Sequence, residues 1–313
     1  MKLATFNDGT RDGQLAVVAR DLKTAHIADG IAPTLQATLD DWHFIAPQLA
    51  TLYADLNAGR ARRPFDFDPD RCMAPLPRAY QLVVGAAYGN HVDDEPRMVQ
   101  CASDDLCGPT DDIVAAHEEW GIDFGAGVAA VTGDVAMGAT PDEAHQQIRL
   151  LMLANEVSLR NLMQSDLEKG AGLLQSRPAT GFSPVAVTPD ELGDAWHDAK
   201  AHLALRASWN GRLVGQVDAG ADMAFNFAQL IAHLARTRNI RTGSIVGSGV
   251  VANRDTSRGY ASIAEQRSRE MVEHGQAVTQ FMRFGDVVRI EVLDEKGRSV
   301  LGAIEQKVAR LAR

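Results

Sequence analysis

The chain has 313 residues, of which 45% are hydrophobic and 23% charged, and its formal net charge is −10. This length suffices for one large or two modest domains, and the composition argues against long disordered segments. A protein that binds nucleic acid needs clustered cations to displace counterions from phosphates. The densest basic cluster is the short run of Arg60, Arg62 and Arg63, so nucleic acid is not an expected partner.

The cysteines and the apolar segments of the sequence indicate where the protein is found. The three cysteines, Cys72, Cys101 and Cys107, are odd in number and lack the spacing of zinc ligands, so we expect buried thiols. No segment has the roughly 20 consecutive apolar residues of a membrane-spanning helix. The chain starts with a strand-like stretch and not with a signal peptide. These observations predict a reduced, cytoplasmic protein that does not enter a membrane.

The N-terminal stretch is predicted to combine a hairpin with a helix. Residues 2–6 and 15–19 are apolar runs separated by Asp-Gly turns, which is typical of a β-hairpin. Residues 34–59 have apolar positions at helical spacing, and Gly59 is expected to end that helix.

A proline-rich segment is expected to divide the chain. Residues 64–77 are irregular and rich in proline, which indicates a boundary. We therefore predict a small N-terminal α+β domain over residues 1–75 and a larger domain over residues 76–313.

The larger part mixes short strands with a few helices. Thr140 can cap a helix in which Pro141 occupies the first turn, which predicts a helix over 141–160. The Asn210-Gly211 turn predicts the clearest hairpin of the chain. Because no βαβ unit repeats, the pattern favours a β-rich α+β fold over a doubly wound sheet. The other expected elements are strands over 128–132, 182–187 and 242–251, a helix over 223–236, and a hairpin over 286–304.

Several motifs of the larger part resemble the fumarylacetoacetate hydrolase family, in the family's order from about residue 75 to the end. The motifs are Asp123-Phe124 followed by Gly133-Asp134, Asn155-Glu156-Val157-Ser158-Leu159-Arg160, Gln175-Ser176-Arg177-Pro178, Gly247-Ser248-Gly249 and Phe281-Met282-Arg283-Phe284-Gly285-Asp286. The resemblance implies the family's β-roll catalytic domain, a mixed β-sandwich, and a homodimer. It implies a small substrate with a 1,3-dicarbonyl or 2-oxo acid group, and C–C cleavage, decarboxylation or tautomerisation as the reaction.

The resemblance also locates the family's metal site, whose carboxylates hold Mg²⁺ or Ca²⁺ so that the metal can chelate substrate oxygens. Gly125 and Gly127 stand where the family has its Glu-x-Glu, and Val84 stands where longer members have an Asp. Only Glu156 remains, one methylene longer than the family's Asp. We therefore expect no family-type metal site and no cofactor, with weak Mg²⁺ or Ca²⁺ binding left open.

Three residues are expected to be catalytic. By resemblance, His91 matches the family's catalytic His and Glu265 matches the Glu that orients it. Such a pair can transfer a proton near neutral pH. Arg177 stands where the family has a substrate-contacting Lys, and its guanidinium suits an anionic substrate. The alternatives are a structurally satisfied His91, a solvated helix residue at 265 and a surface arginine at 177.

Further residues are expected to contact the substrate. Tyr88 can donate a hydrogen bond to a substrate oxygen, or it can be a core residue. Val250 replaces a family Thr and makes the pocket more apolar. Glu156 and Arg160 lie in one motif, and the alternative is that they pair with each other. The expected contacts are Tyr88, Gly125, Gly127, Glu156, Arg160 and Val250.

Three functions remain open. The first is a metal-independent enzyme in which His91 and Glu265 transfer protons and Arg177 replaces the metal's electrostatics. The second is a non-catalytic binder, in which Gly125 and Gly127 widen the old metal pocket for a bulkier ligand. The third is an ordinary family hydrolase with a displaced metal. The candidate ligands for that metal are Asp93, Asp94, Glu95, Asp104, Asp105, Glu118 and Glu119.

Overall fold

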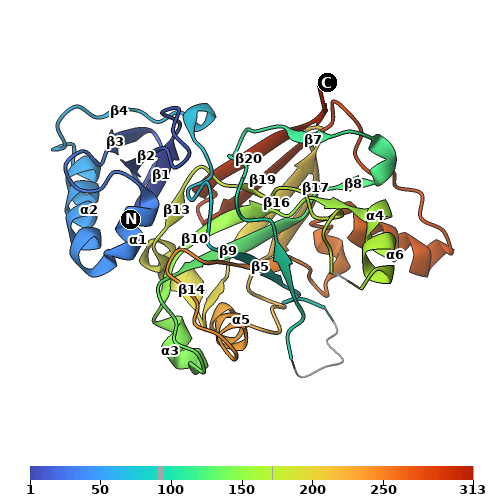
Figure 1. The fold of residues 1–313 in the computed structure, drawn as a ribbon. Helices are drawn as coiled ribbons and strands as arrows, with labels where there is room; N and C mark the ends of the chain where they lie inside the picture. The colour runs from blue at the N-terminus through green and yellow to red at the C-terminus, as the bar shows by residue number, and fades with distance from the viewer. Residues whose placement is uncertain (90–94, 171, 313) are drawn as a thin grey trace.

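A computed structural model of the chain describes residues 1–89, 95–170 and 172–312. Most of its core elements are strands (Figure 1). The larger sheet contains β1 (Lys2–Phe6), β2 (Gln14–Val18), β3 (Thr24–Ile27), β4 (Phe65–Asp66), β5 (Leu82–Gly85), β6 (Met98–Cys101), β9 (Ala126–Thr132), β10 (Ile148–Asn155), β12 (Gly181–Phe182), β13 (Ala186–Val187) and β18 (Ile245–Val250). Its order is β4-β3-β2-β1-β13-β10-β9-β18-β5-β6, and β12 pairs with β10.

A second, five-stranded sheet has the order β17-β16-β19-β20-β7. Its strands are β7 (Ile113–Ala115), β16 (Ala204–Trp209), β17 (Arg212–Asp218), β19 (Val287–Leu293) and β20 (Ser299–Arg310). Two short ribbons complete the strands: β8 (Ile122–Asp123) with β11 (Ser158–Leu159), and β14 (Trp196–His197) with β15 (Lys200–Ala201).

Helices lie around these sheets (Figure 1). The α-helices are α1 (Leu35–Asp40), α2 (Trp42–Asn57), α3 (Pro141–His145), α4 (Arg160–Glu168), α5 (Phe227–Leu234) and α6 (Ile263–His274), and short 3-10 turns cover Pro69–Arg71, Glu118–Trp120, Pro189–Ala195 and Thr256–Arg258. The predicted β-rich α+β class is therefore confirmed. Within the described residues, no helix has the length and apolar content that crossing a bilayer requires.

The N-terminal hairpin is confirmed, since β1 and β2 pair along their whole length. The predicted helix over 34–59 is two helices, α1 and α2, because Asp41 between them has non-helical backbone angles. β1 also pairs with β13 through Lys2↔Val187 and Leu3↔Ala186, so the larger sheet continues from the N-terminal layer into the rest of the chain. The boundary near residue 75 stays a prediction.

The predicted helix over 141–160 is wrong after its first turn. Thr140 does form a capping box with Glu143, but α3 ends at His145 and β10 follows. Side chains of β10 alternate between two buried clusters: Leu151 and Leu153 face one, and Leu150 and Met152 face the other. A strand that is buried on both faces is apolar at nearly every position, so its sequence does not distinguish it from a buried helix.

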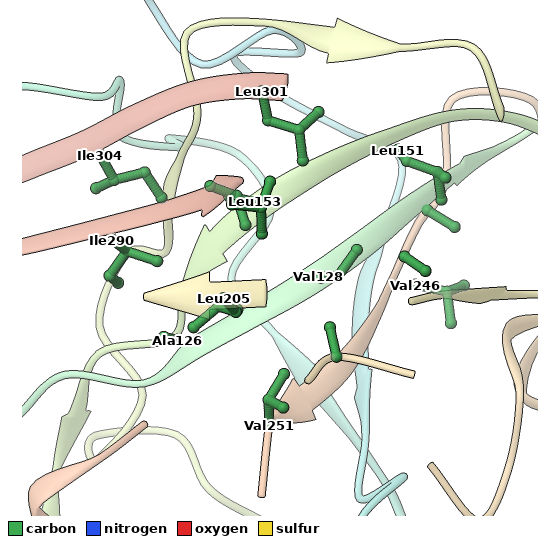
Figure 2. Close-up of a cluster of buried hydrophobic side chains, with 14 of the residues drawn as sticks. Ala126, Val128, Leu151, Leu153, Leu205, Val246, Val251, Ile290, Leu301 and Ile304 are labelled. Carbon is green, nitrogen blue, oxygen red and sulfur yellow. The ribbon is translucent and has the colours of Figure 1, made fainter. Parts of the chain in front are cut away.

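The core between the two sheets places β9 and β10 in the middle of the molecule. Figure 2 shows Val128 and Leu153 of the larger sheet beside Leu205, Ile290 and Ile304 of the smaller one. The start of β9 and the ends of β10 and β18 leave this core close together, because β9 pairs antiparallel with both neighbours. Residues just beyond these strand ends are therefore brought to one place.

The other hairpins agree with the sequence. Asn210 and Gly211 have φ of 49° and 76°, as the predicted two-residue turn between β16 and β17 requires. The hairpin over 286–304 is confirmed as β19 and β20. The predicted helix over 223–236 is shorter, as α5, and the predicted strand over 182–187 is broken into β12 and β13.

Candidate active site

Glu156 is a buried carboxylate at the end of β10. Its backbone N–H donates to the carbonyl of Gly125 at 2.7 Å, and the residue is 2% exposed. Neither side-chain oxygen accepts a hydrogen bond of good geometry from the described residues. Burial raises the pKa of Glu156 to about 7, although Arg177 and the Gly249 amide favour the charged form.

Arg177 faces this carboxylate. Its Nη1 lies 3.8 Å from Oε2 of Glu156, which is a charge interaction but too long for a hydrogen bond. The Nε of Arg177 has no hydrogen-bond partner within residues 1–89, 95–170 and 172–312. The arginine side chain is 14% exposed, so it connects the buried carboxylate with solvent. The alternative of an ordinary surface arginine is wrong.

Asp166, in α4, fixes the residue before Arg177. Its carboxylate accepts hydrogen bonds from the N–H and the hydroxyl of Ser176, both at 2.8 Å. The carbonyl of Ser176 also accepts the N–H of Leu159 at 2.9 Å. These bonds lower the pKa of Asp166, so the carboxylate is charged at neutral pH, and they hold the Arg177 backbone against β11.

Replacing Asp166 with asparagine is therefore expected to loosen Arg177. An amide cannot accept both bonds as strongly as a carboxylate, so we expect at least a five-fold weaker affinity for small carboxylates with a modest fall in melting temperature. Calorimetric titration of the variant and a thermal melt measure the two effects. Gln164→Asn, on an exposed part of the same helix, is the control. Unchanged affinity in the Asp166 variant would show that Ser176 is held in place without it.

The expectation that Gly125 and Gly127 widen a pocket is wrong. A Cβ on Gly125 would lie 2.7 Å from the backbone oxygen of Glu156 and 2.9 Å from Val250 Cγ2. A Cβ on Gly127 would lie 2.7 Å from the carbonyl oxygen of Gly249. These glycines permit close approach of neighbouring backbones, and the space that side chains would take is already filled.

The residues at the family's metal positions do not fit a hard divalent cation. Such a cation needs several oxygen ligands, most of them anionic. Gly125 and Gly127 have no side-chain ligand, and Val84 is buried and apolar. Only Glu156 remains, and it faces the positive charge of Arg177. Across the described ranges, no three His, Cys, Asp or Glu side chains gather as a ligand set.

Two of the acidic residues suggested for a displaced metal have other partners. Glu95 forms an ion pair with Arg236 on the surface, and Glu118 accepts the N–H of Phe284 at 2.7 Å. Asp93 and Asp94 lie outside the described residues.

His91 also lies outside the described residues, so its contact with Glu265 stays a prediction. Glu265 sits in the first turn of α6, where it forms an ion pair with Arg269 and accepts the N–H of Ala261 at 3.1 Å. Its side chain is 18% exposed, so the alternative of a solvated helix residue is wrong. Burial raises the pKa of Glu265.

The alternative pairing of Glu156 with Arg160 is wrong. Arg160 Nε donates to Asp123 Oδ2 at 2.8 Å, and Asp123 also accepts the N–H groups of Ile263 and Ala264 at 2.7 and 3.1 Å. Asp123 thus joins the start of α4 to the start of α6, the helix of Glu265. The sequence motif contains Asp123 but gives no sign of this role, because the three partners of Asp123 are 37 to 141 residues away in the chain.

The other expected contacts surround the same place. The hydroxyl of Tyr88 donates to the carbonyl of Ala219 at 2.6 Å, and burial raises the pKa of Tyr88. Val250 is partly buried and packs beside Gly125. Cys101 lies in the electrostatic range of Arg177 and Glu156, and burial raises the pKa of its thiol to about 11, which makes it a poor nucleophile. All three cysteines are free thiols.

Two surface hollows lie elsewhere. One, of about 430 Å³, is lined by residues that include Trp42, Tyr53 and Glu191. The other, of about 460 Å³, is lined by residues that include Tyr260 and Arg269. Glu156 and Arg177 line neither hollow. The candidate site is therefore defined by its buried charges and by its place at the strand ends, and not by cavity size.

Two family profiles match the chain. The one described as Fumarylacetoacetase N-terminal domain 2 matches residues 1–78, and the one described as Fumarylacetoacetate (FAA) hydrolase C-terminal matches residues 77–309. Among curated proteins, a fumarylacetoacetate hydrolase domain-containing protein 2 homolog from Dictyostelium discoideum is 21% identical over 235 residues, which is 71% of this chain and 70% of that protein.

Solved structures show the same fold. A probable 2-hydroxyhepta-2,4-diene-1,7-dioate isomerase from Mycobacterium abscessus matches with a TM-score of 0.70 and 17% identity, over 100% of both chains. A fumarylacetoacetate hydrolase from psychrophilic Exiguobacterium antarcticum matches with a TM-score of 0.71 and 16% identity, over 99% of this chain and 100% of that one. Since the hydrolase profile alone spans residues 77–309, the chain belongs to the fumarylacetoacetate hydrolase family.

Proposed function

We propose that this protein is an enzyme that acts on a small anionic carbonyl compound, a 1,3-dicarbonyl or a 2-oxo acid, by acid–base chemistry without a divalent metal. The observation that carries the proposal is the guanidinium of Arg177, which faces the one carboxylate left at the family's metal positions, Glu156, at 3.8 Å. A fixed positive charge thus lies beside the one carboxylate that remains of the family's metal ligands.

A guanidinium can do part of what the metal does in the family. It binds a substrate carboxylate through two parallel hydrogen bonds and stabilises negative charge that develops on a nearby oxygen. His91 and Glu265 remain the proposed acid–base pair. A guanidinium does not polarise a carbonyl as strongly as a chelating cation. Tautomerisation, decarboxylation or dehydration with ring closure therefore fits better than hydrolysis of an unactivated C–C bond.

The names of the fold relatives agree with this range of reactions, since one is a probable isomerase and another a hydrolase. We further propose a homodimer, on the family resemblance, and a reducing compartment such as the cytoplasm, on the three free thiols. A non-catalytic ligand-binding protein is the second candidate. The ion pair of Glu265 with Arg269 favours it, because that pair engages Glu265 without a substrate.

Deuterium exchange tests the proposal. The purified protein is incubated in D₂O with 2-oxobutyrate, 2-oxoglutarate or acetylacetone, with EDTA or with Mg²⁺, and loss of the acidic C–H signal is followed by ¹H NMR. We expect enzyme-dependent exchange that EDTA does not reduce, and a fall of about 100-fold in kcat/KM for Arg177→Gln. Arg283→Gln, at an exposed arginine, is the control. Exchange that requires Mg²⁺, or no exchange with any of the three probes, would contradict the proposal.

A further inference from the structure

We infer that Glu156 is itself a catalytic residue: its carboxylate accepts the hydroxyl proton of a substrate enol that Arg177 holds, and returns a proton to the adjacent carbon. The inference rests on the proposed function and deepens it: in the enol–keto step, Glu156 takes the proton-transfer role that the proposed function gives to His91 and Glu265. The substrate considered is the enol form of the 2-oxo acid already proposed, in which the carboxylate and the enol hydroxyl are carried by neighbouring carbons.

Glu156 has two buried acceptor oxygens that no well-aligned donor of the described residues satisfies. Both carboxylate oxygens are buried, and neither accepts a hydrogen bond of good geometry from the residues described here, although the Gly249 amide lies near enough to favour the charged form. Folded proteins seldom leave such a group unsatisfied, because its burial without a partner costs several kcal/mol. Two free acceptors at the end of a central strand are suited to a ligand that brings a hydroxyl group.

The spacing of Glu156 and Arg177 also points to a bound substrate. At 3.8 Å between Nη1 and Oε2, the two groups attract each other without forming a hydrogen bond, so the donors of the guanidinium stay available. A substrate carboxylate can occupy these donors. Its neighbouring enol hydroxyl then lies beside Glu156, because the two charged groups of the protein are as close together as the two polar groups of the substrate.

Glycine backbone surrounds part of the Glu156 carboxylate. A Cβ on Gly127 would lie 3.2 Å from Oε1, and a Cβ on Gly247 would lie 3.1 Å from the same atom. Oε1 therefore lies against bare backbone, where a side chain would crowd it. Among the described residues, the charged groups that face Glu156 are Arg177 and, further away, Arg160, and Arg160 is neutralised by its ion pair with Asp123. The uncharged titratable groups near Glu156 are Tyr88 and Cys101.

This environment supports proton transfer near neutral pH. Burial raises the pKa of Glu156 to about 7, and an acid–base catalyst works best when its pKa is near the operating pH. In the reaction, the enol O–H bond breaks and the proton moves to the carboxylate. The C2–O bond becomes a carbonyl, and C3 takes a proton from the resulting carboxylic acid. Substrate and product have the same atoms, and Glu156 ends as the carboxylate again.

The test compares Glu156→Gln with the parent protein. Glutamine keeps the size of the side chain but cannot accept the proton. We expect exchange at C3 of 2-oxobutyrate to fall at least 100-fold in kcat, with KM changed by less than about three-fold. The rise of kcat/KM with pH through about 7 should disappear. Glu305→Gln, at a Glu that is 53% exposed, is the matched control.

A second probe distinguishes a failure of the inference about Glu156 from a failure of the proposed function. Trimethylpyruvate is a 2-oxo acid without a C3 hydrogen, so its binding can be measured by calorimetry without turnover. We expect Glu156→Gln to bind it as the parent protein does, and Arg177→Gln to bind it at least ten-fold more weakly. Full exchange activity in a folded Glu156→Gln protein would overturn this inference alone. No exchange in the parent protein, with binding unaffected in Arg177→Gln, would overturn the proposed function as well.

Discussion

Replacing Gly125 with alanine is expected to lower the free energy of unfolding by about 3 kcal/mol, the upper end of what overpacking costs. The new Cβ would lie 2.7 Å from a backbone oxygen, that of Glu156, and 2.9 Å from a methyl of Val250. The backbone oxygen cannot move alone, because the N–H of Glu156 is bonded to Gly125. Urea denaturation of the variant and the parent protein measures the difference.

Gly133→Ala is the matched control for this prediction. Its Cβ would lie 2.7 Å from Gln147 Oε1 and 2.8 Å from Arg149 Nε. These atoms belong to the outer parts of long side chains, which can move, so we expect a cost below about 1 kcal/mol. An equal cost for both variants would show that backbone packing around Gly125 is not what limits substitution there.

Gly125→Glu restores one carboxylate at the family's metal site. It places a carboxylate at a position where the resemblance expects a ligand, but its Cβ meets the same atoms. We therefore expect loss of stability without tight binding of Mg²⁺. A stable Gly125→Glu protein that binds Mg²⁺ with one-to-one stoichiometry would show that the strand relaxes easily. The missing carboxylates, and not the backbone packing around Gly125, would then be what prevents metal binding.

Local signals in the sequence predicted the local parts of the fold. The Asn210-Gly211 turn and the capping residue Thr140 act within a few residues, and both are in place. β10 was mistaken for the continuation of a helix, because burial of both its faces depends on two layers that come from distant parts of the chain. Only tertiary structure separates these two readings of a continuous apolar run.

The site was predictable in its residue types but not in its pairings. The motifs pointed to Glu156 and Arg177 separately, and to Arg160 as a partner of Glu156. Arg160 is bound to Asp123 instead, 37 positions earlier in the chain. No periodicity records such a contact. The absence of a side chain at Gly125 was also ambiguous, since a glycine can leave a space or let a neighbouring backbone fill it.

The unsatisfied charge of Glu156 gives a prediction for stability against pH. Its pKa is raised from 4.5 to about 7 in the folded protein, so the folded state binds a proton more tightly than the unfolded state. Between these pH values folding takes up protons, and the free energy of unfolding therefore falls as the pH rises. At about 1.4 kcal/mol for each pKa unit, this loss amounts to about 3 kcal/mol by pH 8. Glu156→Gln is expected to remove it.

The measurement is the difference in unfolding free energy between the Gln variant and the parent protein at several pH values from 4.5 to 8. Other titrating groups contribute equally to both proteins, and they cancel in the difference. Glu270, whose pKa is lowered to about 2 by bonds from Thr279 and its neighbours, loses its stabilising charge only below this range. We expect the variant to gain stability relative to the parent as the pH rises. A stability difference that does not change with pH for Glu156→Gln would mean that the carboxylate is already fully paired in the folded protein. A carboxylate whose oxygens are all hydrogen-bonded would not accept a proton from a substrate, so this result would contradict the role inferred for Glu156.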